Sequence, residues 1–240
     1  MIAALPMYDL PHARAAHDSY WQAIAAHLPG APTALTRDGD LLSIWQSDEL
    51  LLAQTCGLPY RARLHGAVTL VGTPDYGLTG CPPGHYRSVL VTRPGWEGDA
   101  GAATLAFNEP LSQSGWAAAQ NAGLGKGKVL QTGAHAASAR AVAEGGADIA
   151  AIDALTWSML QTEEPGLTGA LTVRNQTPPT PGLPYITAKH RDPAPIAAAI
   201  RDAIGTLTPE DCATLHLKGL MDIPKADYMA LPLPVPPSLG

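Results

Sequence analysis

Short apolar runs alternate with longer segments of mixed polarity along the first two thirds of the chain, which is the rhythm of strands and helices in an α/β protein. Asp9 and Pro11 open a predicted helix that continues to about His27. The apolar runs before and after that helix predict buried strands at Ile2–Met7, Leu50–Gln54, Ala67–Val71 and Ser88–Val91. These elements form a first α/β unit.

The same rhythm restarts after Pro94–Gly101, where glycine and proline replace apolar residues. Helices are predicted from about Ser114 and over Ala136–Glu144. The strands of this part are predicted at Thr104–Phe107, Val129–Gln131 and Asp148–Ile152. Two α/β units are the simplest account of this repeated alternation.

The last third of the chain begins with Thr177–Pro184, where the density of prolines predicts a stiff, extended segment. A strand at Tyr185–Ala188 follows, and then helices near Pro195–Ile204 and Pro209–Leu217. The proline-rich residues Leu231–Gly240 are expected to run along the surface.

Together the elements predict an α/β fold of two lobes, with mixed, mainly parallel sheets and a cleft between the lobes. If the chain enters the second lobe near residue 92 and returns near residue 184, residues 1–91 and 185–240 form lobe 1 and residues 92–184 form lobe 2. A cleft between lobes is a common place for small ligands to bind.

The composition of the chain excludes several classes of protein. Apolar residues make up 46% of the 240 residues and charged residues 15%, enough for a folded core, and no apolar run reaches the roughly 18 residues of a membrane span. The net charge of −6, without a basic cluster, argues against nucleic acid and acidic membrane surfaces as partners. We expect a monomer that binds a small molecule.

Three scattered cysteines, Cys56, Cys81 and Cys212, are too few for a disulfide framework and favour a reducing compartment. The apolar run Ile2–Met7 has neither the basic segment before it nor the cleavage site after it that an export signal requires. The chain as given is therefore expected in the cytoplasm, or in the periplasm if a signal peptide has been removed.

Histidines give no metal-binding pattern. His12 and His17 are five positions apart, about 140° around a helix, and no Cys or His pair has the spacing of a zinc site. We interpret His12, His17 and His27 as ordinary polar positions on one amphipathic helix, and expect neither a metal nor another cofactor.

The segment Asn108–Trp116 follows a predicted strand and precedes a predicted helix. Ser112, Gln113 and Ser114 offer polar side chains there, Gly115 lets a ligand approach the backbone, and the first helical turn has unpaired N–H groups. This arrangement predicts a cradle for a small oxyanion. A serine N-cap without a ligand is the alternative.

Two further junctions carry polar residues at the same edge of the predicted sheet. His135 lies at a helix N-terminus, and Asp153 follows the apolar strand Ile149–Ile152. Taken singly, His135 could be a surface residue and Asp153 the N-cap of the helix that holds Trp157. Together with the serines they predict a binding edge.

Residues of lobe 1 are expected on the facing wall. Tyr8 and Asp9 follow the first strand, and Gln54 and Thr55 end the second. Tyr76 could add an aromatic wall, although an exposed turn is the alternative for its surroundings.

The segment Asn108–Trp116 resembles the Ser-Thr-Ser-Gly phosphonate cradle of the phosphate/phosphonate-type periplasmic solute-binding proteins of ABC importers. The stretch from His135 to Asp153 and the proline-rich segment Thr177–Tyr185 are similar to the same family, and Leu51–Tyr60 resembles it more weakly. The resemblance covers about 80 residues of the second lobe and the hinge. It implies the type II periplasmic binding-protein fold, in which two α/β lobes close on a ligand, and an ABC permease as partner.

By that resemblance the ligand-binding residues would be Ser112, Gln113, Ser114, His135 and Asp153. Gln113 departs from the family pattern, which has threonine at this position. The full set of expected ligand-binding residues is Tyr8, Gln54, Thr55, Tyr76, Asn108, Ser112, Gln113, Ser114, His135 and Asp153.

The charge of these segments limits the ligand. The cradle segments contain no Lys or Arg, whereas Asp153 brings a negative charge, so a zwitterion, a monoanion or a neutral heterocycle fits better than a fully ionised phosphate. Arg61 or Arg87 would reverse this expectation if either reached the cleft.

We therefore expect a solute-binding protein that captures a small polar metabolite by hinge closure, without covalent chemistry. One alternative is a cytosolic sensor or accessory protein on the same fold. The other is an enzyme with Cys56 as nucleophile and with His135 and Asp153 as base and orienting residue.

Overall fold

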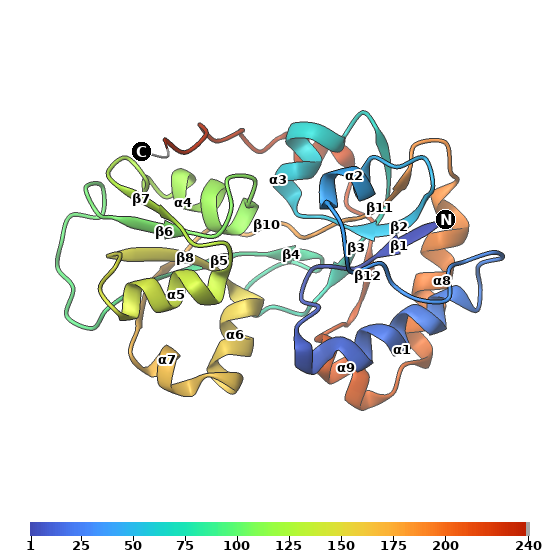
Figure 1. Cartoon of the computed structure of the whole chain (residues 1–240), viewed down its shortest axis with the longest axis horizontal. Coiled ribbons are helices and arrows are strands. Elements are labelled where there is room, and N and C mark those ends of the chain that lie inside the picture. The colour runs from blue at the N-terminus through green and yellow to red at the C-terminus, as the bar shows by residue number, and fades with distance from the viewer. Residues whose placement is uncertain (239–240) are drawn as a thin grey trace. The chain divides into compact units, whose positions relative to one another are not determined.

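The structure is a computed structural model that describes residues 1–238 (Figure 1). By its internal contacts the chain divides into two compact units. Unit 1 comprises Met1–His85 and Pro181–Leu231, and unit 2 comprises Tyr86–Thr180 and the segment from Pro232. Each unit is an α/β layer structure with its own five-stranded sheet.

Unit 1 has the sheet order β1-β2-β11-β3-β12. Its strands are β1 (Ile2–Ala4), β2 (Leu50–Gln54), β3 (Val68–Asp75), β11 (Tyr185–Ala188) and β12 (Gly219–Met221). Its helices are η1 (Pro11–Ala13), α1 (Arg14–Ala25), α2 (Leu41–Trp45), α3 (Gly57–Pro59), η2 (Tyr60–Leu64), α8 (Pro193–Thr206), α9 (Pro209–Leu215) and α10 (Lys225–Met229).

Two apolar clusters hold unit 1 together, one on each face of its sheet. Trp21 of α1 and Ile200 of α8 belong to one cluster. Trp45 of α2 and Tyr228 of α10 belong to the other. Figure 1 shows α1 and α9 on one side of the sheet and α2 and α3 on the other.

Unit 2 has the sheet order β7-β6-β8-β5-β9. Its strands are β5 (Ser88–Thr92), β6 (Leu105–Phe107), β7 (Val129–Gln131), β8 (Ile149–Asp153) and β9 (Thr172–Gln176). Its helices are η3 (Gln113–Ala117), α4 (Ala118–Asn121), α5 (His135–Ala143), α6 (Ala154–Glu163) and α7 (Pro165–Gly169).

Strand β8 shows how the sequence builds unit 2. Its side chains alternate between the two faces of the sheet. Ala150 and Ile152 pack in the cluster beneath α5 and α6, whereas Ile149 and Ala151 pack in the cluster that includes Trp116. Because both faces are covered, the strand is apolar along its whole length until Asp153.

The predicted α/β class with mixed sheets is confirmed, but "mainly parallel" overstates it. The pairs β1–β2, β6–β7 and β6–β8 are parallel, and the other neighbours in the two five-stranded sheets are antiparallel. The reason lies in the connections. Strands β5 and β11 each enter their sheet without a crossover helix, directly after the short strands β4 (His85–Tyr86) and β10 (Thr180–Pro181), and each runs antiparallel to both of its neighbours.

The strands β4 and β10 pair in a two-stranded sheet, and the chain passes from one unit to the other within them. The division into lobe 1 (residues 1–91 and 185–240) and lobe 2 (residues 92–184) stays a prediction.

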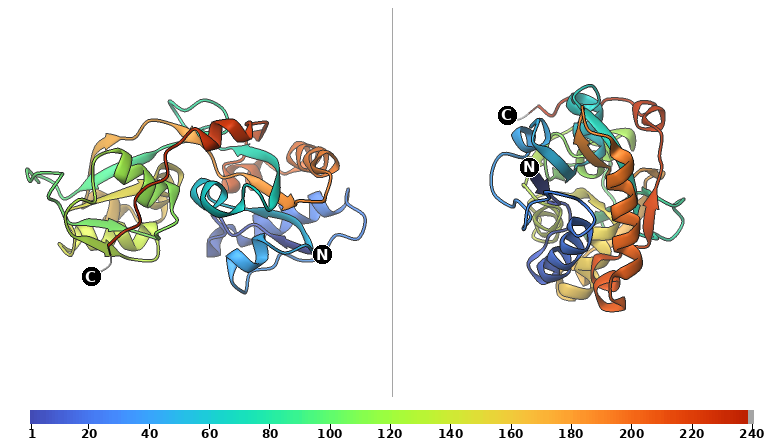
Figure 2. Two further views of the ribbon diagram at one scale, coloured as in Figure 1. Left: turned by 90° about the horizontal axis from the view of Figure 1, so that it is seen from above. Right: turned by 90° about the vertical axis from the view of Figure 1, so that its right-hand side faces the viewer.

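The segment from Pro232 groups with unit 2. The indole N–H of Trp116 donates a hydrogen bond of 2.8 Å to the carbonyl oxygen of Val235 in this segment. In the left view of Figure 2 the dark red segment passes over the green helices of unit 2.

None of the helices described has the length and apolarity to cross a lipid bilayer.

Candidate functional site

The start of η3 forms a compact cluster of hydroxyl groups. Ser112 precedes the helix in an extended conformation, and its Oγ accepts a hydrogen bond of 2.9 Å from the N–H of Gly115. Ser112 Oγ lies 3.5 Å from Ser114 Oγ. Gln113 begins a single π-helical turn, a feature that is frequent at functional sites. All three side chains from Ser112 to Ser114 are buried.

The hydroxyl cluster continues to the first residue of α5. Ser114 Oγ and His135 Nε2 form a hydrogen bond of 2.8 Å. Burial lowers the pKa of His135 to about 4, against a smaller opposite effect of the Ala151 carbonyl. The imidazole is therefore neutral at pH 7. Two side chains that the sequence predicted to converge, from different strand-to-helix junctions, are in direct contact.

Asp153 lies at the end of the neighbouring strand β8 and caps α6. Its Oδ1 accepts hydrogen bonds of 2.8 Å from the Leu155 N–H and 3.0 Å from the Thr156 N–H. The N-cap role that the sequence left open is therefore present. Asp153 is 2% exposed.

Ser88, which the sequence did not single out, connects Asp153 to the hydroxyl cluster. Its backbone pairs with Asp153 across β5 and β8, and its Oγ donates a hydrogen bond of 2.9 Å to the carbonyl oxygen of Ser114. The only signal in the sequence was a hydroxyl at the start of a buried strand. Ser88 holds the backbone of η3 against the end of the sheet.

Asn108 packs against the turn that holds the two serines. A methyl group on Gly115 would collide with Asn108 Oδ1, so a larger residue here would have to displace the Asn108 side chain. Asn108 Oδ1 is buried and, among the described residues, has no hydrogen-bond partner. The carbonyl oxygen of Asn108 accepts a hydrogen bond of 3.0 Å from the Gly133 N–H.

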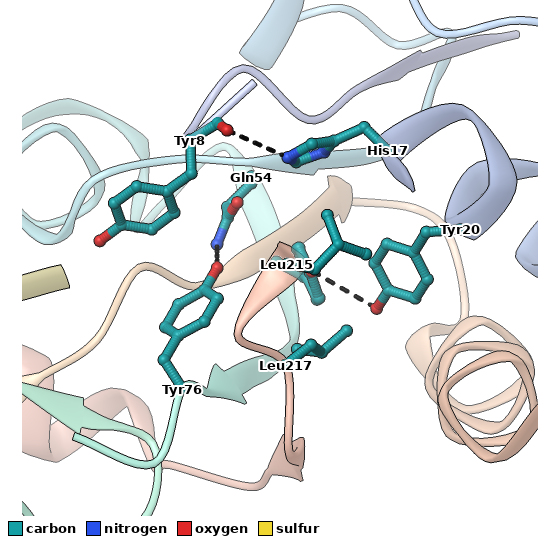
Figure 3. Close-up of a pocket in the computed structure, with 8 residues that line it drawn as sticks. Tyr8, His17, Tyr20, Gln54, Tyr76, Leu215 and Leu217 are labelled. Atoms are coloured by element: carbon teal, nitrogen blue, oxygen red, sulfur yellow. Dashed lines mark hydrogen bonds between the residues drawn. The ribbon is translucent and has the colours of Figure 1, made fainter. Parts of the chain in front are cut away.

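Unit 1 has a pocket of its own (Figure 3). Three of the predicted ligand-binding residues, Tyr8, Gln54 and Tyr76, line it. Gln54 Nε2 donates a hydrogen bond of 2.8 Å to the Tyr76 hydroxyl, and the rings of Tyr8 and Tyr76 pack edge to face with centroids 5.2 Å apart. The other lining residues are His17, Tyr20, Tyr185, Leu215 and Leu217. Thr55 is buried next to Gln54 but does not line this pocket.

The interpretation of His17 as an ordinary polar position is wrong. His17 is 6% exposed, and its Nε2 lies 3.2 Å from the carbonyl oxygen of Tyr8. Tyr8 has a left-handed backbone with φ of 64°, which is unusual for a large side chain and turns the chain back toward α1. The sequence did not reveal this turn. His12 and His27 are exposed, but they lie outside α1, His12 in η1 and His27 beyond the C-terminus of α1.

Neither arginine considered in the sequence analysis lines the pocket of unit 1. Arg61 is buried, and its Nη1 donates a hydrogen bond of 3.1 Å to the Leu231 carbonyl. Arg87 Nη1 donates a hydrogen bond of 2.7 Å to Gln176 Oε1. The polar groups of the pocket and of the hydroxyl cluster are thus mostly neutral donors and acceptors, with Asp153 as the nearby carboxylate.

Residues 1–238 contain no group of three or more His, Cys, Asp or Glu side chains placed to hold a metal ion. Within the same range, Cys56, Cys81 and Cys212 form no disulfide bond.

A family of known proteins matches most of the chain. Residues 45–229 match the family described as "ABC transporter, phosphonate, periplasmic substrate-binding protein". No protein with a curated description matches the chain.

Solved structures show the same fold at low sequence identity. PhnD1 from Prochlorococcus marinus, in complex with methylphosphonate, has a TM-score of 0.71 and 15% identity, covering 95% of this chain and 94% of that chain. A binding protein component of an ABC phosphonate transporter from Pseudomonas aeruginosa has a TM-score of 0.69 and 14% identity, covering 95% and 82%. XAC2383 from Xanthomonas citri, bound to ATP, has a TM-score of 0.69 and 13% identity, covering 96% and 94%. These likenesses confirm the two-lobe periplasmic binding-protein fold.

Proposed function

The chain belongs to the family of periplasmic substrate-binding proteins of ABC phosphonate transporters, and from this premise we propose that it captures a small phosphonate at the hydroxyl cluster of unit 2. The proposed ligand-binding residues of this unit are Asn108, Ser112, Gln113, Ser114, His135 and Asp153.

The contact between Ser114 and His135 is the observation that carries the proposal. It joins the turn of η3 to the start of α5, so that hydroxyl and imidazole groups lie beside the N-terminus of η3. Unpaired N–H groups at a helix start attract anions, and rotatable hydroxyls can donate hydrogen bonds to phosphonate oxygens. A cradle of this kind binds a tetrahedral oxyanion without a cation.

The absence of Lys and Arg from Asn108–Trp116 favours a ligand of low net charge. His135 adds no positive charge at pH 7, because burial lowers its pKa to about 4. Neutral donors stabilise a dianion poorly next to the carboxylate of Asp153. The proposed ligand is therefore a monoanionic or zwitterionic phosphonate, or a phosphate ester of similar charge.

The facing wall is proposed to come from Tyr8, Gln54, Thr55 and Tyr76 of unit 1, with hinge closure bringing both walls onto the ligand. The partner proposed for delivery of the ligand is an ABC permease. Two relatives support the assignment by their own descriptions, one holding methylphosphonate and one named as a transporter component.

The alternative with Cys56 as a nucleophile has less support. The family is one of solute-binding proteins rather than enzymes. Both groups that would activate the thiol already have other hydrogen bonds, His135 with Ser114 and Asp153 with the first turn of α6. We expect Cys56→Ala to keep the ligand affinity of the wild type.

Calorimetric titration with methylphosphonate, 2-aminoethylphosphonate and inorganic phosphate tests the proposal. Ser114→Ala and His135→Ala are each expected to weaken phosphonate binding about 5- to 150-fold, since each removes one partner of a buried polar contact. Ser158→Ala and His190→Ala change exposed residues of the same types and should bind like the wild type. Unchanged affinity in both cluster variants, with normal thermal unfolding, would refute the assignment.

A further inference from the structure

The lining of the unit 1 pocket includes a buried hydrogen-bond acceptor, the Nδ1 atom of His17. His17 Nδ1 is buried and has no hydrogen-bond partner among the described residues. Its other nitrogen, Nε2, faces the carbonyl oxygen of Tyr8, which can only accept. Nε2 therefore carries the proton, and Nδ1 presents a lone pair. Burial lowers the pKa of His17, which keeps the ring neutral at pH 7.

A donor lies in the same pocket. The hydroxyl of Tyr185 donates a long hydrogen bond of 3.4 Å to the hydroxyl oxygen of Tyr20. Among the described residues no acceptor takes the proton of Tyr20 itself. Burial raises the pKa of Tyr20 far above neutral pH, so the proton is present. Figure 3 shows His17 and Tyr20 on the same helix, with both side chains lining the pocket.

The pocket is uncharged and small. Its lining has no Lys, Arg, Asp or Glu. The carboxylate of Asp9, beside His17, is paired with Arg37 at 2.7 Å, and Arg37 also pairs with Asp18. The space has room for a group about the size of one water molecule.

We propose that this pocket is a specificity subsite for a single hydroxyl group of the captured solute. A hydroxyl donates to His17 Nδ1 and accepts from the Tyr20 hydroxyl at the same time. An alkyl group leaves both atoms unpaired. An ammonium group has no lone pair for Tyr20 and meets no carboxylate in the lining. The proposal rests on the proposed function in one respect, since it takes the hydroxyl to be the substituent of a phosphonate.

Three phosphonates of nearly equal size, titrated by calorimetry, test the subsite. Hydroxymethylphosphonate is expected to bind the wild type about tenfold more tightly than ethylphosphonate and aminomethylphosphonate. Tyr20→Phe and His17→Gln should each reduce this preference to less than about threefold, because each removes one of the two polar partners. His27→Gln, an exposed histidine just beyond α1, should keep the preference.

The ¹⁵N chemical shift of His17 Nδ1 gives a readout in the wild type that does not depend on how the variants fold. It should move with hydroxymethylphosphonate and not with ethylphosphonate. Equal affinities, or a preference for the ethyl or amino compound, would overturn the subsite alone. A shift that already indicates a hydrogen-bonded Nδ1 without ligand would also overturn it, by assigning the pocket to a buried water. Failure of all three compounds to bind would overturn the proposed function and the subsite together.

Discussion

Acidification tests the environment of His135, because its pKa is about 4 in the folded protein against an ordinary value of 6.5. Below pH 6.5 the unfolded chain binds a proton at this residue that the folded chain does not, so the free energy of unfolding falls as the pH falls. The loss begins near pH 6.5 and is complete near pH 4. A difference of about 2.5 pKa units, at about 1.36 kcal/mol each, corresponds to a loss of about 3 kcal/mol.

Urea unfolding at a series of pH values from 7.5 to 3.5, compared between the wild type and His135→Gln, isolates this effect. The buried His17 and the partly buried His216 also have lowered pKa values, but they contribute equally to both proteins. The variant is expected to lose about 3 kcal/mol less than the wild type between pH 6.5 and pH 4. His190→Gln, at an exposed position, should follow the wild type. Parallel curves for the wild type and His135→Gln would refute the burial of this imidazole in neutral form.

Three further predictions concern the scaffold of the site. Gly115→Ala should destabilise the protein by about 1–3 kcal/mol, and Asn108→Ala should relieve most of that cost in a double-mutant cycle of urea unfolding. Asp153→Ala removes the N-cap of α6 and should lower the free energy of unfolding by about 1–2 kcal/mol. If Asp153→Asn lost as much stability, the negative charge could not be dispensable at this cap. Trp116→Phe removes the donor to Val235 and should speed proteolytic cleavage after residue 231, whereas an unchanged cleavage rate would contradict an anchored C-terminal segment.

Much of the fold could be predicted because several of its strands are apolar runs that are buried along their whole length. Leu50–Gln54 and Tyr185–Ala188 are such strands, and both have the bounds that the sequence predicted. The exposed strand Val129–Gln131 also has its predicted bounds. Strand direction was harder, because β5 and β11 have no crossover helix before them. An apolar run marks a strand but carries no sign of its direction.

The contacts of the hydroxyl cluster followed from local rules. A polar residue at the end of a buried strand and a serine before a helix are both visible in the sequence, and Ser114 and His135 do meet. Ser88 could not be found in this way, because its partner is a backbone carbonyl that only the tertiary structure brings near. Leu215 and Leu217 line the same pocket as Tyr8, but they lie about 200 positions away along the chain, so the sequence alone could not place them there.

His17 shows the limit of reading a helix by its polarity alone. Its position on α1 is polar, yet it is buried because the left-handed turn at Tyr8 covers it. Nothing in the residue type of Tyr8 predicts such a backbone, which glycine or asparagine adopt far more readily.

A crystal structure of the protein soaked with methylphosphonate would locate the bound ligand. We expect phosphonate oxygens within hydrogen-bonding distance of the Ser112 and Ser114 hydroxyls and of the His135 ring. A phosphonate bound elsewhere in the molecule, with the Ser114–His135 hydrogen bond unchanged, would refute the assignment of the hydroxyl cluster as the binding site.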